Sequence, residues 1–350
     1  MKGRVIVLGT YRGREAAALL VDGRLEDLLV DCGDAVAFAP GAILRGLLDR
    51  PMKGQGGAFV KLPDGEKGFL RETKGLAPGR PVLVQVAGFA EPGKALPVTT
   101  RILFKSRLCI VTPAAPGINV SRRIREEEAR ARLVALAEAG MTGSDFGLIL
   151  RSAADLAEDD EVSADLAATR ALAEAVMADT AGAPELLVAA PAPHEEAWRD
   201  WAEPAPDEVA EGSDAFARHG VEEMVDGLLS PIVALHGGGS MAIEPTRALV
   251  AVDVNTGADT SPAASLKTNI AAARELPRQL RLRGLGGQVS IDFAPMPKRD
   301  RAALEQQIRQ AFKGEAAETS LAGWTPLGNF ELQRKRDRLP LDLILTEGLA

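Results

Sequence analysis

Two short runs of strand-forming residues, separated by a longer amphipathic segment, mark the C-terminal third of the chain. Residues 248–252 are apolar and lead into Asp253-Val254-Asn255-Thr256-Gly257, while residues 288–291 lead into Asp292. The charged segment between them, about residues 264–283, has the length of a helix. A strand–helix–strand unit makes its two strands parallel neighbours. The pattern therefore predicts that Asp253 and Asp292 lie side by side at the carboxyl edge of a sheet, where open α/β sheets bind ligands.

Two carboxylates at one sheet edge repel each other unless a cation lies between them. Mg²⁺ suits such a place, because it needs few protein carboxylates and completes its shell with water and phosphate oxygens. Asn255 lies two residues beyond Asp253, points to the same side, and can hold a coordinated water or a phosphate. The alternative is that both aspartates merely end strands or cap turns, as Asp often does, and spacing alone leaves both interpretations open.

The first third of the chain alternates short apolar runs with turn residues. Residues 4–9 and 15–21 predict strands, and Asp22-Gly23 predicts a hairpin turn into a third strand through residues 28–30. Residues 36–103 continue as short strand-like pieces broken by Gly and Pro, a pattern that is typical of a small barrel.

Basic residues follow two predicted elements in the middle of the chain. Ser121 is the predicted N-cap of the helix that follows it, so Arg122 and Arg123 would lie in a first turn where the helix dipole disfavours cations. This placement indicates an anion to be held, although ordinary surface charge is the alternative. Residues 147–150 predict a strand that ends at Arg151-Ser152, where an exposed guanidinium and a hydroxyl can bind phosphate.

The remaining segments carry weaker signals. Residues 181–235 are acidic and Pro-rich, whereas residues 297–312 predict a helix. A basic phrase near the end contains Arg334, Lys335 and Arg336, which can bind RNA phosphates or simply solvate a helix.

Composition narrows the class of protein. The chain has 350 residues, of which 46% are hydrophobic and 26% charged, as in an ordinary globular protein of two to four domains. Its formal net charge of −8 argues against indiscriminate coating of nucleic acid but allows a local basic groove. Cys32 and Cys109 match no zinc or redox spacing. No apolar stretch approaches the length of a membrane span, so we expect a cytoplasmic protein without membrane contact.

Several phrases of the C-terminal third resemble, in one register, the catalytic domain of the ribonuclease E/G family. They are residues 248–257, 267–276, 278–287 and 291–293. The resemblance implies that Asp253 and Asp292 hold Mg²⁺ and that Asn255 supports them, so that all three are catalytic. It also implies an RNA-binding OB-fold in which Phe59 and Phe69 can stack on unpaired bases, although both can equally be barrel core residues.

The same resemblance implies further RNA contacts and a domain plan. Arg151 and Ser152 match a pocket that recognises the 5′-monophosphate of RNA, and the phrase containing Arg334 and Arg336 is also similar to the family. The expected fold is α/β, more exactly a multi-subdomain α+β chain. Its predicted parts are 1–35, the first part of an RNase H-like subdomain; 36–104, an OB-fold barrel; 105–180, a 5′-phosphate sensor-like region; 181–236, the second part of the RNase H-like subdomain; and 237–350, a DNase-I-like catalytic domain.

Three departures from the family pattern qualify these expectations. Ala294-Pro295-Met296 stands where the family carries a further acidic residue close to the site, and Pro277 falls inside the predicted crossover helix, which it should kink. The sequence also lacks the Cys-Pro-x-Cys zinc link and small dimerisation domain of long members. We therefore expect no structural zinc, and a monomer or a simple homodimer.

The sequence thus predicts a Mg²⁺-dependent endoribonuclease that cleaves single-stranded RNA and favours 5′-monophosphorylated, A/U-rich substrates. One alternative is an RNA-binding protein of the same fold that has weak or lost cleavage. Another is a metal-dependent enzyme on mononucleotides, which would leave the OB-like region unused.

Overall fold

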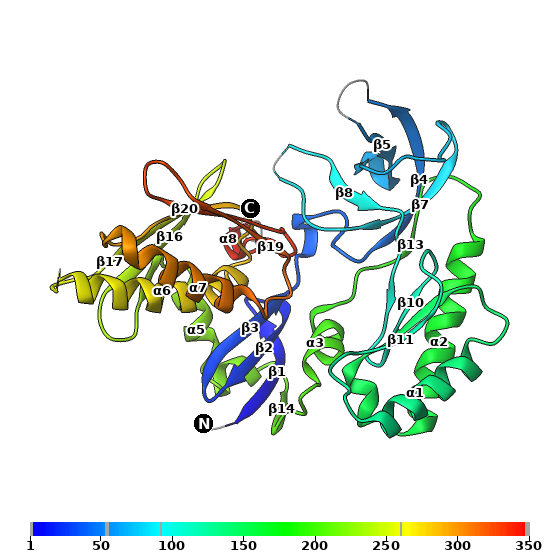
Figure 1. The fold of residues 1–350 in the computed structure, drawn as a ribbon. Coiled ribbons are helices and arrows are strands. Elements are labelled where there is room, and N and C mark those ends of the chain that lie inside the picture. Colours follow the sequence, from blue (N-terminus) through cyan, green and yellow to red (C-terminus); the bar gives the residue numbers. More distant parts are fainter. Residues whose placement is uncertain (1–2, 53–55, 92, 260, 347–350) are drawn as a thin grey trace. The chain divides into compact units, whose positions relative to one another are not determined.

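A computed structural model describes residues 3–52, 56–91, 93–259 and 261–346. The chain divides into two compact units, each built from separate stretches of sequence. The first contains the described residues up to Ile6 together with Val36–Ala210, and the second contains Val7–Ala35 and Glu211–Ala350. Figure 1 shows the elements of each unit along the chain.

A closed barrel forms the first part of unit 1. Its sheet runs in the order β4, β5, β6, β8, β7, and β4 also pairs with β7, which closes the ring. The strands are β4 (Ile43–Pro51), β5 (Ala58–Lys61), β6 (Lys67–Leu70), β7 (Pro81–Val86) and β8 (Leu96–Thr99). A short 3₁₀ turn, Pro63–Gly65, lies between β5 and β6, whereas the 3₁₀ turn Gly33–Ala35 belongs to unit 2. The predicted small barrel is confirmed. A further strand, β13 (Glu185–Val188), pairs with β4 on its outer side, so the predicted segment 181–236 is divided between the two units.

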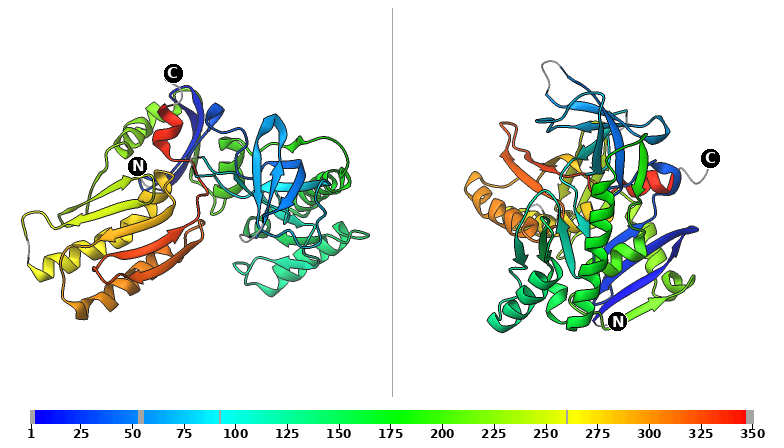
Figure 2. Two further views of the ribbon diagram at one scale, coloured as in Figure 1. Left: turned by 90° about the horizontal axis from the view of Figure 1, so that it is seen from above. Right: turned by 90° about the vertical axis from the view of Figure 1, so that its right-hand side faces the viewer.

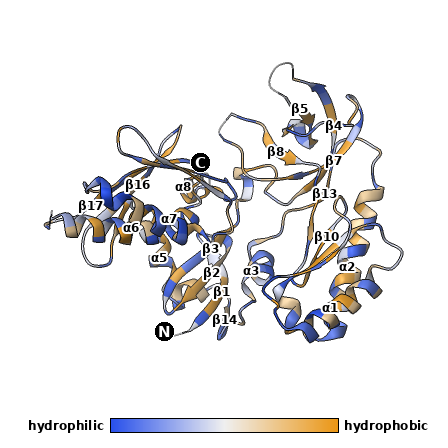
Figure 3. Cartoon of the chain, in the orientation of Figure 1, coloured by the Kyte–Doolittle hydropathy of each residue, from blue (hydrophilic) through white to orange (hydrophobic). Residues whose placement is uncertain are grey.

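The rest of unit 1 is a small sheet covered by two helices. Its order is β11, β12, β10, β9, with bounds β9 (Phe104–Lys105), β10 (Cys109–Thr112), β11 (Ile118–Val120) and β12 (Gly147–Leu150). The helices are α1 (Glu127–Gly140) and α2 (Asp159–Ala178), with α3 (Pro193–Trp201) further along and a 3₁₀ turn at Ser152–Asp155. Figure 3 shows α2 mostly in hydrophobic colours, in keeping with its buried positions such as Val162 and Leu166.

The predicted start of α1 is wrong. The helix begins at Glu127, and its first turn contains Glu127 and Glu128, which suit the helix dipole better than the arginines that precede them. The Ser121 hydroxyl instead accepts a hydrogen bond from the backbone N–H of Arg123 at 3.3 Å. Arg122 and Arg123 therefore lie in the turn between β11 and α1.

A four-stranded sheet of order β14, β1, β2, β3 combines three strands from the start of the chain with one strand from about 180 residues later. Its strands are β1 (Arg4–Tyr11), β2 (Arg14–Val21), β3 (Arg24–Val30) and β14 (Glu208–Glu211), and the division into units passes through β1 and β14. The predicted hairpin is confirmed. Asp22 and Gly23 have φ values of 50° and 77°, the left-handed conformation that a two-residue hairpin turn requires.

The largest sheet of unit 2 has six strands in the order β15, β16, β17, β18, β20, β19. They are β15 (Ile232–Ala234), β16 (Ser240–Pro245), β17 (Val250–Asn255), β18 (Gly287–Asp292), β19 (Thr319–Trp324) and β20 (Phe330–Arg334). The helices α6 (Pro262–Leu282) and α7 (Arg301–Phe312) lie next to each other and pack against this sheet (Figure 2). A 3₁₀ turn, Lys298–Asp300, precedes α7. The predicted crossover helix is confirmed, and it continues as one helix past Pro277.

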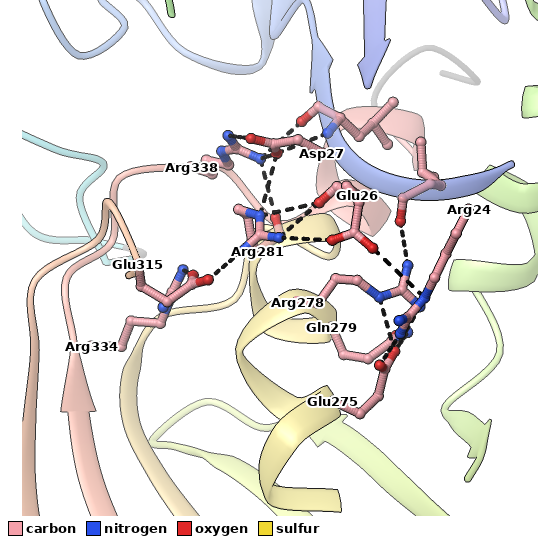
Figure 4. A network of polar contacts seen from close by, with 12 residues as sticks. Arg24, Glu26, Asp27, Glu275, Arg278, Gln279, Arg281, Glu315, Arg334 and Arg338 are labelled. Carbon is pink, nitrogen blue, oxygen red and sulfur yellow. Dashed lines mark hydrogen bonds and ion pairs between the residues drawn. The ribbon is translucent and has the colours of Figure 1, made fainter. Parts of the chain in front are cut away.

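Ionic contacts tie the N-terminal hairpin to the large sheet within unit 2. Arg281 on α6 pairs with Glu26 and Asp27 at 3.7 Å and also pairs with Glu315, while Arg338 pairs with Asp27 (Figure 4). The remaining helices of the unit are α4 (Ala215–Arg218), α5 (Val221–Leu228) and α8 (Leu341–Thr346). Within the described part of the chain, no helix combines the length and apolarity that crossing a membrane requires.

Candidate functional site

The two strand-end aspartates are direct neighbours in the large sheet. β17 and β18 are parallel, and Asp253 is the ladder partner of Asp292. Val250 pairs with Val289 and Val252 pairs with Ile291 in the same register. The structure therefore brings together the two carboxylates that the sequence pattern placed at one edge.

Both carboxylates belong to the face of the sheet that the helices leave uncovered. Along β17, Val250, Val252 and Val254 are buried, whereas Asp253 and Asn255 are exposed. The same alternation continues in β18, where Val289 and Ile291 are buried and Asp292 is exposed. Since successive side chains of a strand point to opposite faces, the aliphatic residues face α6 and α7, and the aspartates and Asn255 share the open face.

Asn255 contacts one of the aspartates directly. Its Nδ2 donates a hydrogen bond to Oδ2 of Asp253 at 2.7 Å. The bond restricts the rotation of the Asp253 carboxylate and leaves its second oxygen available to a ligand. This geometry is compatible with the supporting role that we predicted for Asn255.

A buried side chain that the sequence reading missed holds the chain just beyond Asp292. Asn269 on α6 is fully buried, and its amide both donates to the carbonyl oxygen of Ala294 and accepts from the Ala294 N–H, each at 2.9 Å. Ala294 lies two residues after Asp292, so this pair of hydrogen bonds anchors the segment that follows β18. The available signal was an Asn in the interior of a helix, where its propensity is poor without a tertiary partner.

The pair of carboxylates fits a hard cation that binds few protein ligands. In the described part of the chain, no group of three or more His, Cys, Asp or Glu residues is arranged to hold a metal ion. Mg²⁺ is commonly bound through one or two carboxylates, with water and substrate phosphates as its other ligands. Two exposed, in-register carboxylates and an amide that orients one of them meet that requirement.

A pair of aromatic rings lies on the outer surface of the barrel. Phe59 on β5 and Phe69 on β6 are ladder partners, and their ring centroids are 5.8 Å apart in an edge-to-face arrangement. Their neighbours Ala58, Val60 and Leu70 belong to the barrel core, whereas both Phe side chains are only half-buried. The two rings line a pocket of about 680 Å³ together with residues that include Met52, Lys67 and Lys94. The alternative that they are core residues therefore does not hold.

The basic residues in the middle of the chain meet at the carboxyl ends of a second parallel strand pair. Val120 of β11 is the ladder partner of Leu150 of β12, so Ser121 lies next to Arg151. Arg122 and Arg123 follow Ser121 and are exposed. Ser152 begins the 3₁₀ turn after β12 and is partly exposed.

Arg151 is not free at this edge. Its Nη1 donates to the carbonyl oxygens of Ser106 and Arg199, at 2.8 and 3.1 Å. Its Nη2 donates to Oδ1 of Asp200 on α3 at 2.6 Å. Burial raises the pKa of Asp200, but the hydrogen bonds and charges of Arg199 and Arg151 outweigh it, so that the pKa lies below its ordinary value. The acidic partner of Arg151 is therefore an ionised Asp200.

The expectation that Arg334 binds RNA does not fit its position. Arg334 lies on strand β20, not on a helix, and only 2% of its side chain is exposed. It pairs with Glu315 at 2.9 Å, so its guanidinium is a buried structural cation that phosphate cannot approach. Arg336, two residues further on, is partly exposed and lies against Gly287 at the start of β18.

These features define a mixed α/β protein that carries an acidic site at the carboxyl edge of a six-stranded sheet and a closed β-barrel with two half-buried aromatic rings on its outer face. The sequence model of the Ribonuclease E/G family matches residues 104–211 and 205–337. The chain belongs to this family.

Individual relatives are similar over most of the chain. Ribonuclease E of Synechocystis sp. is 31% identical over 377 residues, which cover 92% of this chain and 55% of that protein. Ribonuclease E of Nostoc sp. is 29% identical, with coverage of 92% and 54%. Ribonuclease G of Escherichia coli K12 is 30% identical over 307 residues, with coverage of 76% and 62%. The chain thus spans between about half and three fifths of the length of these relatives.

Proposed function

We propose that this protein is a Mg²⁺-dependent endoribonuclease that cleaves single-stranded RNA. The observation that carries the proposal is the register of the large sheet, which makes Asp253 and Asp292 neighbours on its open face. Family membership supports the reaction, since the relatives above are named ribonuclease E and ribonuclease G.

The side chains of the site have separate tasks in this proposal. Asp253 and Asp292 hold the ion, and Asn255 keeps the Asp253 carboxylate in the orientation that binding needs. When bound, Mg²⁺ supplies a Lewis acid for the phosphodiester and lowers the pKa of an attacking water. Asn269 anchors Ala294 and thereby restricts where Asp292 can lie. Because the carboxylates are in place before substrate arrives, little reorganisation is needed in the transition state.

The barrel supplies a means of holding unpaired bases. Phe59 and Phe69 form a half-buried edge-to-face pair that lines a pocket. Stacking of a base on an aromatic ring is worth about 1–3 kcal/mol and tolerates any sequence. Lys67 lines the same pocket and can pair with a phosphate. Lys94 lines it as well but is paired with Glu91 at 2.6 Å, so a phosphate would compete with that carboxylate. We propose that this surface favours single strands, with A/U-rich segments preferred because they stay unpaired.

The finer division of the chain is also part of the proposal. We assign the barrel as the OB-fold, residues 105–180 as a 5′-phosphate sensor-like region, the sheet containing β1–β3 as RNase H-like, and residues 237–350 as DNase-I-like. A preference for 5′-monophosphate RNA would use Arg122, Arg123, Arg151 and Ser152. A terminal phosphate must then displace Asp200 from Arg151.

The decisive experiment removes one carboxylate charge at a time. Asp253→Asn and Asp292→Asn keep the side-chain shape, and metal-centred catalysis contributes several kcal/mol, so cleavage should fall about 100-fold or more. RNA binding and the circular dichroism spectrum should stay close to wild type. Glu222→Gln, an exposed position on α5, is the matched control and should cleave normally.

Cleavage of a 5′-labelled single strand with Mg²⁺ or with chelator completes the test. Near-wild-type cleavage by either aspartate variant would show that the ion is bound elsewhere. A wild-type protein that binds RNA but does not cleave it with Mg²⁺ would be an RNA-binding member of the fold instead. The exposed Pro295 next to the site, where the family pattern has a carboxylate, makes this the alternative to exclude.

A further inference from the structure

Most arginines of the large α/β sheet and its helices have a partner of their own. Arg274 contacts Gln307, Arg278 contacts Glu275, and Arg309 contacts Glu305. Arg301, the first residue of α7, is different. Among the residues that the structure describes, no hydrogen bond or ion pair involves its guanidinium, and its Nε is buried without an acceptor. An arginine that is held in place but lacks an anion is a candidate for binding one.

An aromatic ring holds Arg301 in position. Its Cζ lies 4.5 Å from the centroid of the Trp324 ring, which is cation–π distance. Trp324 itself packs against Phe293 and Phe330, at centroid distances of 5.9 and 5.3 Å. Stacking restricts the guanidinium plane before any ligand binds and leaves the donors of Nη1 and Nη2 for a phosphate, which reduces the entropy cost of binding.

The sheet places Arg301 at the same edge as the aspartates. Phe293 directly follows Asp292, and the terminal Nη2 of Arg301 lies close to Gly328 in the turn between β19 and β20. Asn329 precedes Phe330, whose ladder partner is Ile291, so this turn lies beside Asp292. Trp324 and Phe330 pack on the helix-covered side, whereas Asp292 is on the open face. Arg301 is thus suited to bind an RNA phosphate next to the phosphate that would be cleaved at Asp253 and Asp292.

A second cation lies on the other side of the aspartate pair. Lys267 on α6 approaches Gly237, with its Nζ 3.1 Å from the position a Cβ would occupy there. The adjoining Gly239 lies against the backbone of Asn255 at the end of β17. Lys267 has no acidic partner among the described side chains, and it is exposed. The strand ends that carry Asp253 and Asp292 therefore lie between two cations.

We propose that Arg301 and Lys267 bind RNA backbone phosphates on either side of the cleaved one, so that the strand runs across the carboxyl edge of the sheet. This inference rests on the proposed ribonuclease function. Two further features agree with it. A cation in the first turn of a helix is electrostatically unfavourable unless an anion is held there, and the helix N-terminus itself supplies donors to phosphate. Among the described residues, neither cation forms an ion pair with a carboxylate.

The test separates charge from packing. Arg301→Met keeps an unbranched chain on the Trp324 ring but removes the charge, and Lys267→Met does the same at the other position. Arg309→Met is the matched control, because it removes one charge from the same helix at a position paired with Glu305. All proteins carry Asp292→Asn, so that RNA remains intact while its affinity is measured.

The dissociation constant of a 12-nucleotide single strand is measured by fluorescence anisotropy over a series of salt concentrations. Each lost phosphate contact should lower the slope of log K against log salt by about 0.7, and affinity at low salt should fall roughly three- to tenfold. Arg301→Met and Lys267→Met should each show this change, and Arg309→Met should not. Arg301→Lys should keep the slope, since it keeps the charge. Arg301→Gln, which also removes the charge, replaces the Met variant if that protein unfolds.

The outcomes distinguish the two levels of the argument. Slopes for Arg301→Met and Lys267→Met equal to that of Arg309→Met would show that Arg301 and Lys267 bind no RNA phosphate. That result overturns this inference and leaves the ribonuclease function standing. Continued cleavage by the Asp292→Asn background, or no RNA binding by any protein, overturns the proposed function and, with it, the phosphate contacts of Arg301 and Lys267. A change in slope at only one of the two positions supports a phosphate contact at that residue and overturns the contact at the other.

Discussion

At the scale of single residues, Asp200 decides what Arg151 can do. A carboxylate accepts from the guanidinium in the same manner as a phosphate does, and Asp200 already occupies Nη2 of Arg151. Because the charges of Arg199 and Arg151 hold the pKa of Asp200 below its ordinary value despite burial, this carboxylate is ionised at neutral pH. A 5′-phosphate must compete with it, so we expect a weak end preference in the wild-type protein.

Asp200→Asn should therefore strengthen the preference for a 5′-monophosphate end. The amide keeps the shape but loses the charge that competes with phosphate, and the ratio of cleavage rates on 5′-monophosphate and 5′-hydroxyl RNA should rise about threefold to tenfold, which corresponds to roughly 1 kcal/mol. Arg151→Ala should abolish the preference and leave the rate on 5′-hydroxyl RNA unchanged. Equal ratios in the wild type and both variants would mean that Arg151 serves only the structure.

The pH dependence of this contact has a definite sign. A carboxyl group whose pKa is lowered in the folded state stabilises the fold above its unfolded pKa, and it loses that contribution as pH falls through the lowered value. The Arg151–Asp200 contact should thus persist at neutral and mildly acidic pH. The difference in stability between the wild type and Asp200→Asn should therefore stay constant through this range and shrink only at lower pH, as Asp200 becomes protonated. Midpoints of urea unfolding measured along a pH series check this.

At the scale of elements, two parallel strand pairs present candidate residues in the same way. β11 and β12 end directly before Ser121 and Arg151, and the last ladder partners of β17 and β18 are Asp253 and Asp292. Parallel strands bring their carboxyl ends to one edge, where loops are free to carry function. The position of those ends depends on what anchors the loops, and Asn269 is the anchor behind Asp292.

Asn269→Leu tests this anchor. The change leaves the buried N–H and C=O of Ala294 without partners, and each unsatisfied group costs about 1–3 kcal/mol, so unit 2 should lose roughly 2–6 kcal/mol of stability. Cleavage should fall more than RNA binding does, because Asp292 loses its support. Thr268→Val, at the preceding buried position, should change neither stability nor cleavage much. Urea denaturation and cleavage rates of the folded variants provide the comparison.

At the scale of the whole molecule, each compact unit is assembled from distant stretches of chain. In unit 2, the guanidinium of Arg278 donates to the carbonyl oxygen of Leu25, and that of Arg281 donates to the carbonyl oxygen of Glu26 (Figure 4). The network extends through Glu315 to the buried Arg334. Removal of one member of such a buried set is costly, because it leaves an uncompensated charge in the interior.

Glu315→Gln should accordingly destabilise unit 2 by about 3–5 kcal/mol, the range observed for breaking a buried ion pair. Glu305→Gln, which breaks the exposed pair with Arg309 on α7, should cost less than about 1 kcal/mol. The midpoints of urea unfolding, followed by Trp fluorescence, report both values. Similar midpoints for the two variants would show that the Glu315 network is screened by solvent.

The sequence by itself determined the local elements and the edge that carries the aspartates. Alternating and 3.6-residue patterns are short-range, so they predicted the hairpin at Asp22-Gly23, the barrel strands, and the parallel pair that makes Asp253 and Asp292 neighbours. The kink at Pro277, which the residue alone predicts, stays a prediction. The helix itself continues past Pro277, because packing of a whole helix outweighs one local preference.

Only the tertiary structure decided which side chain meets which. Arg151 finds its carboxylate 49 residues away, Asn269 finds the Ala294 backbone 25 residues away, and β13 joins the barrel rather than the second unit. Arg334 belongs to a basic phrase that suggests an exposed position, but its side chain points to the buried side of β20. The charge of a residue and its local spacing indicate what it can bind. Its actual partner depends on contacts between residues far apart in the sequence, which local patterns do not determine.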